Sequence, residues 1–190
     1  MLNKTLIKIA KIFNNEQITW ALGGSLLLKF KGLDIEPHDI DILVSIEDAK
    51  KADELLSKIS QARQNKSNTN NRFFSTEYFC KYLVDNIEID LMANLIINYD
   101  IQGNTYQYKY ILNKETIQEE ILVKNTKIPL TTLEDWFILY NIMPDKNEQI
   151  KLLEYYFKNN KANHPKILKN QLTSNIPEHV KEKISVLLTL

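Results

Sequence analysis

The sequence predicts a mixed α/β fold in which a short β-sheet is backed by helices and followed by a helical C-terminal region. Three observations support this prediction. Short β-branched apolar runs, such as residues 40–46, are typical of buried strands. Longer runs with apolar residues every three to four positions alternate with them, as is typical of amphipathic helices. Beyond residue 130 the helical pattern dominates, with prolines near its breaks.

The N-terminal part of the chain is expected to alternate between helices and strands. Apolar residues interleaved with lysines predict an amphipathic helix at 2–14. A short apolar strand at 18–22 leads into two glycines, and the leucine-rich run after them predicts a helix at 25–31. A strand at 39–46 and a helix at 47–62 follow, the helix with its lysines on a solvated face.

The middle of the chain predicts a β-hairpin. Residues 61–71 are rich in Asn, Ser and Gln, so this segment is the one most expected to be disordered. Strands at 73–83 and 86–93 come next, and turn-forming residues separate them. The second strand alternates strictly, which places its apolar side chains on one face and both Glu88 and Asp90 on the other.

The rest of the chain is expected to contain a strand or irregular arm, a further strand and then helices. Three tyrosines alternate in residues 105–112, as a strand or an irregular arm that stacks a base or packs on the core. A strand at 125–129 precedes the C-terminal helices. The chain is therefore divided into a core at 1–130 and a C-terminal helical region packed on it at 131–190. The helices of that region are expected at about 131–143, 147–159, 164–173 and 178–188.

Composition narrows the classes of function. The chain has 190 residues, is 44% hydrophobic and has zero formal net charge, so no global field attracts it to nucleic acid or an acidic membrane. Cys80 is the only cysteine, which excludes an intrachain disulfide and fits a reduced, cytoplasmic setting. No apolar stretch approaches the length of about 18 residues that would span a membrane.

A glycine turn and a pair of acids are the most informative motifs. Glycines 23 and 24 would let the backbone approach a bulky anion, and the Ser25 hydroxyl with nearby N–H groups would bind phosphate oxygens. Asp39 and Asp41 lie two apart on a strand, so their carboxylates share a face, repel each other and need a cation. Taken singly, the turn could be a helix cap and the acids a solvated strand edge. The order and spacing of both motifs favour a site.

The run Trp20-Ala-Leu-Gly-Gly-Ser25, followed by Pro37-His-Asp-Ile-Asp-Ile-Leu-Val44, resembles the signature of the DNA polymerase β-like nucleotidyltransferase superfamily. The chain is most similar to its small stand-alone bacterial members. These include the lincosamide and aminoglycoside nucleotidyltransferases and the minimal nucleotidyltransferases of two-gene systems. The resemblance covers residues 15–95 well and 125–158 loosely. It implies a nucleotidyltransferase fold, with residues 1–130 as the catalytic core.

The resemblance also implies a metal-dependent reaction on a nucleoside triphosphate (NTP). Asp39, Asp41 and Asp90 would bind Mg²⁺, with two ions expected, and would be the catalytic residues. Asp90 would ligate the second metal or accept a proton, with Glu88 as the alternative third carboxylate. The nucleotide would lie on Gly23, Gly24 and Ser25. His38 would touch a phosphate or metal, or would be only a polar neighbour.

The implied reaction moves a nucleoside monophosphate to an acceptor hydroxyl on an antibiotic, an RNA end or a protein. Some positions depart from the family pattern: Tyr140 stands where relatives often have a lysine, and residues 144–148 match the charged cluster of relatives poorly. Nucleotide selection or acceptor binding could therefore differ. The alternative function is a non-catalytic nucleotide-binding or antitoxin-like partner protein of a two-gene system. The sequence leaves the acceptor, the base preference and a homodimer or cognate partner protein open.

Overall fold

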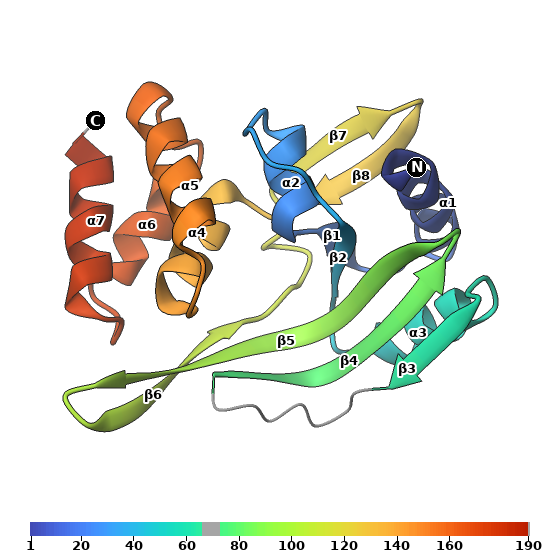
Figure 1. Ribbon diagram of the computed structural model, residues 1–190, viewed down its shortest axis with the longest axis horizontal. Coiled ribbons are helices and arrows are strands. Elements are labelled where there is room, and N and C mark those ends of the chain that lie inside the picture. The colour runs from blue at the N-terminus through green and yellow to red at the C-terminus, as the bar shows by residue number, and fades with distance from the viewer. Residues whose placement is uncertain (66–72, 190) are drawn as a thin grey trace.

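The computed structural model describes residues 1–65 and 73–189, which form a mixed β-sheet surrounded by helices (Figure 1). The order of hydrogen-bonded strands is β3-β4-β5-β2-β1-β8-β7, and β6 pairs with the C-terminal half of β5. The strands are β1 (Trp20–Leu22), β2 (Asp39–Val44), β3 (Ala62–Asn65), β4 (Phe74–Val84), β5 (Ile87–Ile101), β6 (Asn104–Tyr110), β7 (Glu119–Val123) and β8 (Thr126–Leu130).

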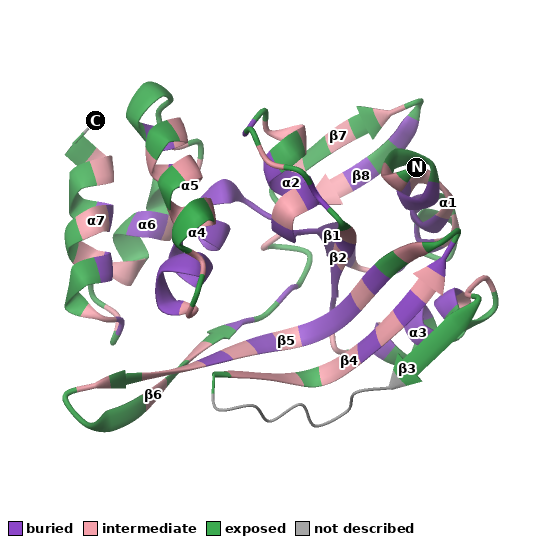
Figure 2. Ribbon diagram, in the orientation of Figure 1, coloured by how far each residue is buried: buried purple, intermediate pink, exposed green. Residues whose placement is uncertain are grey.

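The centre of the sheet is formed by β5, β2 and β1. Strand β2 runs parallel to β5 and antiparallel to β1, while β1 runs parallel to β8, so the sheet is mixed as predicted. The β2–β5 register places Asp39 beside Glu88 and Asp41 beside Asp90. Figure 2 shows that the middle of β5 is buried, and Ile89 and Leu91 there have no exposed surface. The acids between them lie on the opposite face of the strand.

The hairpin of β4 and β5 turns at Asp85 and Asn86, both with positive φ. This left-handed conformation is required in the tightest hairpin turns, and Asn and Asp tolerate it better than other side chains do. The hairpin prediction is therefore confirmed. Strand β5 continues well past residue 93, where it was expected to end, because β6 supplies a partner for its C-terminal half.

The helices cover the sheet and form a group at the C-terminus (Figure 1). Helix α1 packs against β8 and α3, α2 against β2, and α3 against β4 and β5. Every residue of α4 is buried, because α5, α6, α7 and β5 surround it. The helices are α1 (Leu2–Asn15), α2 (Gly24–Phe30), α3 (Ala49–Ser57), α4 (Leu133–Ile142), α5 (Asn147–Asn159), α6 (Pro165–Gln171) and α7 (Glu178–Thr189).

Two expectations about local structure were wrong. The helix predicted at 47–62 ends at Ser57, and residues 62–65 of the expected disordered loop form the edge strand β3. The side chains of residues 62–64 are exposed, so β3 carries no apolar alternation that could mark it as a strand. The remainder of the loop prediction, residues 66–71, lies outside the described residues.

Strand β7 was not predicted. It forms an edge hairpin with β8 around Lys124 and Asn125, which both have positive φ. An Asn in a two-residue turn between apolar runs is a hairpin signal that was available in the sequence. The tyrosines of residues 105–112 lie on a regular strand, β6. Tyr110 is buried and donates a hydrogen bond to Asp135, so it packs on the core.

Within residues 1–65 and 73–189, no helix is long and apolar enough to cross a membrane.

Candidate active site

Three carboxylates from two neighbouring strands meet at one point of the sheet. Asp39 and Asp41 lie on β2 and Asp90 on β5, and one oxygen from each lies within 4.8 Å of the others. Parallel pairing of β2 with β5 produces this cluster, because it sets Asp41 directly beside Asp90 and the alternation of β2 brings Asp39 to the same face. The structure thus brings together the three acids that the sequence singled out.

Gly24 makes room for one of these carboxylates. It has a φ of +62°, and a Cβ atom built on it would lie 1.8 Å from Oδ2 of Asp41. Any side chain at position 24 would therefore collide with Asp41 and would also strain the backbone. Glycine is needed here for contact within the protein, in addition to any approach of a phosphate.

Gly23 allows the side chains of Trp136 and Leu43 to pack closely against the turn. A Cβ atom there would lie 2.4 Å from Trp136 and 2.6 Å from Leu43. The Trp136 indole donates to Thr131, whose hydroxyl donates to the carbonyl of Leu22, so the ring is held against the turn. The N–H of Gly23 donates to the carbonyl of Asp41 at 3.0 Å and is thus engaged within the sheet.

The electrostatics of the cluster are those of crowded like charges. Burial, together with the neighbouring charges of Asp39 and Asp90, raises the pKa of Asp41 to about 7, and Lys146 and Lys81 oppose this shift. Burial likewise raises the pKa of Asp90. The positive charge of Lys81 opposes this shift, and the negative charge of Asp39 adds to it. A cation bound between the acids would reverse both shifts.

Asp90 and Glu88 differ in exposure and share one counter-ion. The Asp90 side chain is 14% exposed and that of Glu88 is 67% exposed. Lys81, on the paired strand β4, places its Nζ 3.2 Å from Asp90 Oδ1 and 3.7 Å from Glu88 Oε2. Asp90 alone of the two belongs to the carboxylate cluster. Glu88 lies at the solvent end of the same strand face.

The three carboxylates of the cluster could hold a metal ion. Mg²⁺ is bound in proteins by carboxylate oxygens together with substrate phosphates. Asp90 Oδ1 is buried and lacks a hydrogen bond of good geometry among the described residues, although Lys81 lies at ion-pair distance. A buried acceptor without a hydrogen bond is costly, so an additional ligand at this oxygen would stabilise it.

Two cavities adjoin the cluster, and both are lined by Asp41, Asp90, Tyr140 and Lys146. The larger, about 680 Å³, is called the polar cavity here. Its further lining residues are Ser25, Asp34, Ile35, Glu36, His38, Asp39, Glu148, Gln149 and Leu152.

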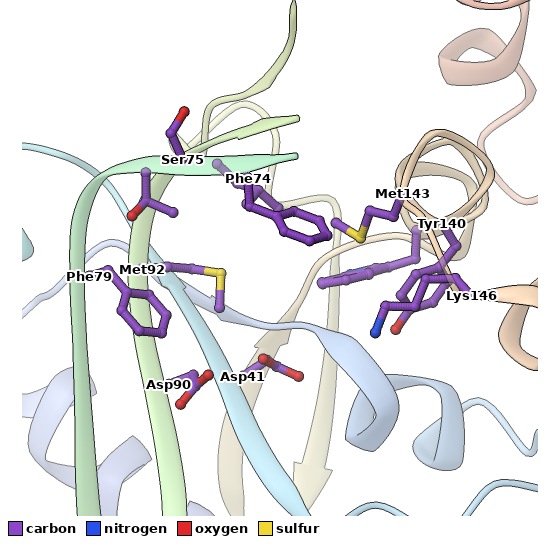
Figure 3. Close-up of a pocket in the computed structure, with 12 residues that line it drawn as sticks. Asp41, Phe74, Ser75, Phe79, Asp90, Met92, Tyr140, Met143 and Lys146 are labelled. Carbon is purple, nitrogen blue, oxygen red and sulfur yellow. The ribbon is translucent and has the colours of Figure 1, made fainter. Parts of the chain in front are cut away.

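The smaller cavity, about 290 Å³, is called the apolar cavity (Figure 3). Asp41 and Asp90 lie side by side at one end of it, with Phe79 and Met92 beside them and Tyr140 and Lys146 across from them. Its further lining residues are Phe74, Ser75, Thr76, Leu95, Trp136 and Met143.

The residues that the sequence predicted to bind the nucleotide lie in two different places. Ser25 and His38 line the polar cavity beside Asp39. Gly23 and Gly24 lie under Trp136 and Asp41 as described above. Tyr140 lines both cavities at the place where a lysine was expected, and its ring lies 5.1 Å from that of Trp136.

Lys146 was not recognised as a site residue from the sequence. It precedes α5, its Nζ lies 5.8 Å from the centre of the Tyr140 ring, and it lines both cavities. Its charge also lowers the pKa of Asp41. The sequence did contain a clue to this lysine. Lys146 lies within the charged segment 144–148, at the place where relatives have a charged cluster, although that segment matches the cluster poorly. The structure supplies a lysine at the site from a different position than the pattern suggested.

Comparisons with known proteins agree with this geometry. The model of a family described as aminoglycoside-2''-adenylyltransferase matches residues 5–158. No curated protein matches the chain.

Solved structures with a similar fold include a protein described as a nucleotidyltransferase from Thermotoga maritima, at a TM-score of 0.59 and 21% identity over 83% of this chain and 92% of that one. The lincosamide antibiotic adenylyltransferase LnuA, solved with lincomycin, has a TM-score of 0.52 and 17% identity over 80% and 95% of the two chains. ANT(2'')-Ia, solved with adenylyl-2''-tobramycin, has a TM-score of 0.54 and 10% identity over 99% and 97%.

Proposed function

Because the chain belongs to the aminoglycoside-2''-adenylyltransferase family, we propose that it moves a nucleoside monophosphate from an NTP to the hydroxyl of a small molecule, with Mg²⁺ bound at Asp39, Asp41 and Asp90. The protein is a nucleotidyltransferase with a mixed α/β fold of that class. The observation that supports the metal-dependent mechanism is the carboxylate cluster, whose oxygens approach within 4.8 Å although like charges repel.

In this mechanism the acceptor oxygen attacks the α-phosphorus. A new O–P bond forms, the bond between the α-phosphorus and the bridging oxygen breaks, and pyrophosphate leaves with that electron pair. Asp90 accepts the proton of the acceptor hydroxyl, because its carboxylate belongs to the cluster and lines both cavities. When bound, Mg²⁺ supplies neutralisation of the charge on the triphosphate and the departing pyrophosphate.

The other residues of the site position the substrate. The turn at Gly23, Gly24 and Ser25 lies along the triphosphate, the Ser25 hydroxyl donates to a phosphate oxygen, and His38 contacts the phosphates from the other side of the polar cavity. Lys146 supplies positive charge where the phosphates and the carboxylates meet. Most of the rate gain in such a reaction comes from positioning and charge.

The proposed acceptor is a small molecule, since LnuA and ANT(2'')-Ia were solved with lincomycin and with adenylyl-2''-tobramycin. The zero net charge of the chain disfavours a long RNA, because no global positive field would attract it. The proposed setting is the cytoplasm, where NTPs and Mg²⁺ are supplied. The single cysteine, Cys80, is a buried free thiol, which fits that setting.

The first experiment measures binding of an NTP analogue with a non-hydrolysable α,β bond, with Mg²⁺ and with EDTA. Wild-type protein is expected to bind only with Mg²⁺, while the Asp39→Asn, Asp41→Asn double variant loses this dependence. Transfer is then followed with α-labelled NTPs and small-molecule, RNA and protein acceptors. Equal Mg²⁺-dependent affinity in the wild type and the double variant would disprove the carboxylate metal site. Labelled RNA or protein in place of a small molecule would disprove the acceptor class.

A further inference from the structure

The two cavities differ in their lining residues and share the carboxylates Asp41 and Asp90. Each cavity is therefore considered as the site of a different substrate. In phosphoryl transfer the attacking and leaving oxygens lie roughly in line on opposite sides of the phosphorus. The acceptor and the triphosphate therefore need separate space around the carboxylates, and two cavities with different linings adjoin them. Asp41 and Asp90 line both cavities, so either substrate can reach them.

The triphosphate fits the polar cavity. This cavity contains Ser25 of the glycine turn together with His38, and its volume of about 680 Å³ is more than twice the 290 Å³ of the other. The apolar cavity includes neither Ser25 nor His38 in its lining. The acceptor is thus left with the apolar cavity.

The walls of the apolar cavity are aromatic and thioether side chains. Phe74 and Phe79 from β4, Met92 from β5 and Trp136 and Tyr140 from α4 face it (Figure 3). Such side chains bind planar or alicyclic apolar groups. Ser75 and Thr76 of β4 add uncharged hydroxyl groups to this lining.

Its charges are unsuited to a polycation. Among the described lining residues the acids are Asp41 and Asp90, which the metal site employs, and the remaining charged residue is Lys146. A ligand with several ammonium groups would bring them next to Lys146 and onto apolar surface, and it would find no further carboxylate to pair with. Buried charges need partners, so this cavity disfavours a polycationic aminoglycoside.

We propose that the apolar cavity is the acceptor site and selects a small hydroxyl compound with an apolar face and at most one positive charge, in preference to a polycationic aminoglycoside. This rests on the proposed nucleotidyl transfer. The hydroxyl of the acceptor points toward Asp90, while its apolar face lies on Phe79 and Met92. A volume of about 290 Å³ lies at the lower end of small-molecule pockets, so the acceptor is small or only partly enclosed.

The test uses full-length protein with Mg²⁺ and the non-hydrolysable NTP analogue, and measures the affinity of added acceptors. The probes are tobramycin as the polycation, lincomycin as a compound with a single basic amine, and a panel of neutral aromatic and alicyclic alcohols. Lincomycin or a neutral panel member is expected to bind more tightly than tobramycin. Transfer to the tightest binder is then measured with α-labelled NTP.

Two variants locate the binding. Phe79→Ala is expected to weaken the best-binding neutral or singly charged probe about tenfold, a loss of about 1.4 kcal/mol, and to leave analogue affinity within about twofold. Phe30→Ala is the matched control, because Phe30 also packs half-buried on the core but lines neither cavity. Thr76→Asp, which adds a carboxylate to the cavity, is expected to raise the affinity for tobramycin.

Three results would overturn the proposal: tobramycin as the tightest probe, no binding of lincomycin or any neutral probe, or a Phe79→Ala effect on the nucleotide analogue in place of the acceptor. The last result would mean that the nucleobase occupies the apolar cavity. Failure of the proposed function is distinguishable, because it appears as an absence of Mg²⁺-dependent analogue binding in wild-type protein before any acceptor is added.

Discussion

Gly24 and Asp41 lie so close together that the properties of one depend on the other. The positive φ of Gly24 and the 1.8 Å that would separate its Cβ from Asp41 Oδ2 are two distinct constraints. Gly32 has the first constraint without the second, since its φ is +86° and nothing lies within 4 Å of a Cβ built there. This pair of glycines allows backbone strain to be separated from displacement of the carboxylate.

Gly24→Ala is expected to weaken Mg²⁺-dependent binding of the NTP analogue by more than about tenfold, because the new methyl group displaces Asp41. Both Gly24→Ala and Gly32→Ala should lose about 1–2 kcal/mol of stability in urea unfolding from the left-handed backbone. Only the first should lose metal-dependent binding. Similar analogue affinity in the two variants would mean that the Gly24–Asp41 contact does not position the metal site.

The exposure of the two acids on β5 predicts different roles. Asp90→Asn changes a member of the cluster whose side chain is only 14% exposed, whereas Glu88→Gln changes a side chain that is 67% exposed. Asp90→Asn is expected to lower single-turnover transfer by about 10²–10⁴-fold while it changes analogue affinity less, as loss of a general base does. Glu88→Gln should stay near wild type. The opposite ranking would assign the third carboxylate to Glu88.

At the level of elements, hydrogen bonds to Asp53 connect helix α3 to strands β3 and β4. Its carboxylate accepts hydrogen bonds from Arg63 on β3, with Nε at 2.7 Å, and from the hydroxyls of Tyr78 and Tyr82 on β4. Burial alone would raise the pKa of Asp53, but these hydrogen bonds outweigh it and hold the pKa well below its ordinary value of 3.8. The ionised carboxylate thereby secures an edge strand that has little apolar side chain to bury.

The network predicts a defined pH dependence of stability. Because the folded pKa of Asp53 is depressed, its contribution is present above pH 3.8, the unfolded value, and is lost as the pH falls below it. At pH 7, Asp53→Asn is expected to lower the free energy of unfolding by about 2 kcal/mol. The difference from wild type should shrink by about 1 kcal/mol at pH 3.

Urea unfolding at both pH values measures this effect. Glu54→Gln, an exposed acid on the same helix, is the control and should show neither the loss nor its pH dependence. A difference between wild type and Asp53→Asn that stays constant from pH 7 to pH 3 would contradict a depressed pKa at this carboxyl.

At the level of the whole molecule, the site is assembled from the sheet and the C-terminal helices. The carboxylates come from β2 and β5, whereas Tyr140 comes from α4 and Lys146 from the segment before α5. Both cavities are therefore bounded by the sheet on one side and by helices on the other. Substrate binding should depend on both parts of the chain.

Lys146→Met is expected to weaken Mg²⁺-dependent analogue binding by about tenfold or more, because a hydrogen bond to a charged group contributes about 1.5–3 kcal/mol. Methionine keeps much of the apolar stem and removes the charge. Lys151→Met, an exposed lysine on the adjoining helix α5, is the matched control. Calorimetric titration that finds equal affinities in the two variants would exclude Lys146 from phosphate binding.

Several features of this protein could be predicted from the sequence because they depend on neighbours along the chain. The alternation of residues 87–91 and the Asp85-Asn86 turn define a hairpin and place Asp90 opposite its apolar face. The glycine turn and the acids of β2 also lie where the pattern placed them. Strand β3 could not be predicted in the same way, because an exposed edge strand pairs through its backbone and leaves no apolar period.

The sequence by itself determined the types of element, the strand faces and the family to which the motifs point. Only the tertiary structure decided that β2 pairs in parallel with β5 so that Asp41 and Asp90 are neighbours, and that Lys146 reaches them from the helices. It also decided that the Asp41 carboxylate occupies the space that a side chain at position 24 would need. The physical reason is that alternation fixes which face of a strand a side chain occupies, whereas the strand or helix beside it is chosen by packing between distant segments.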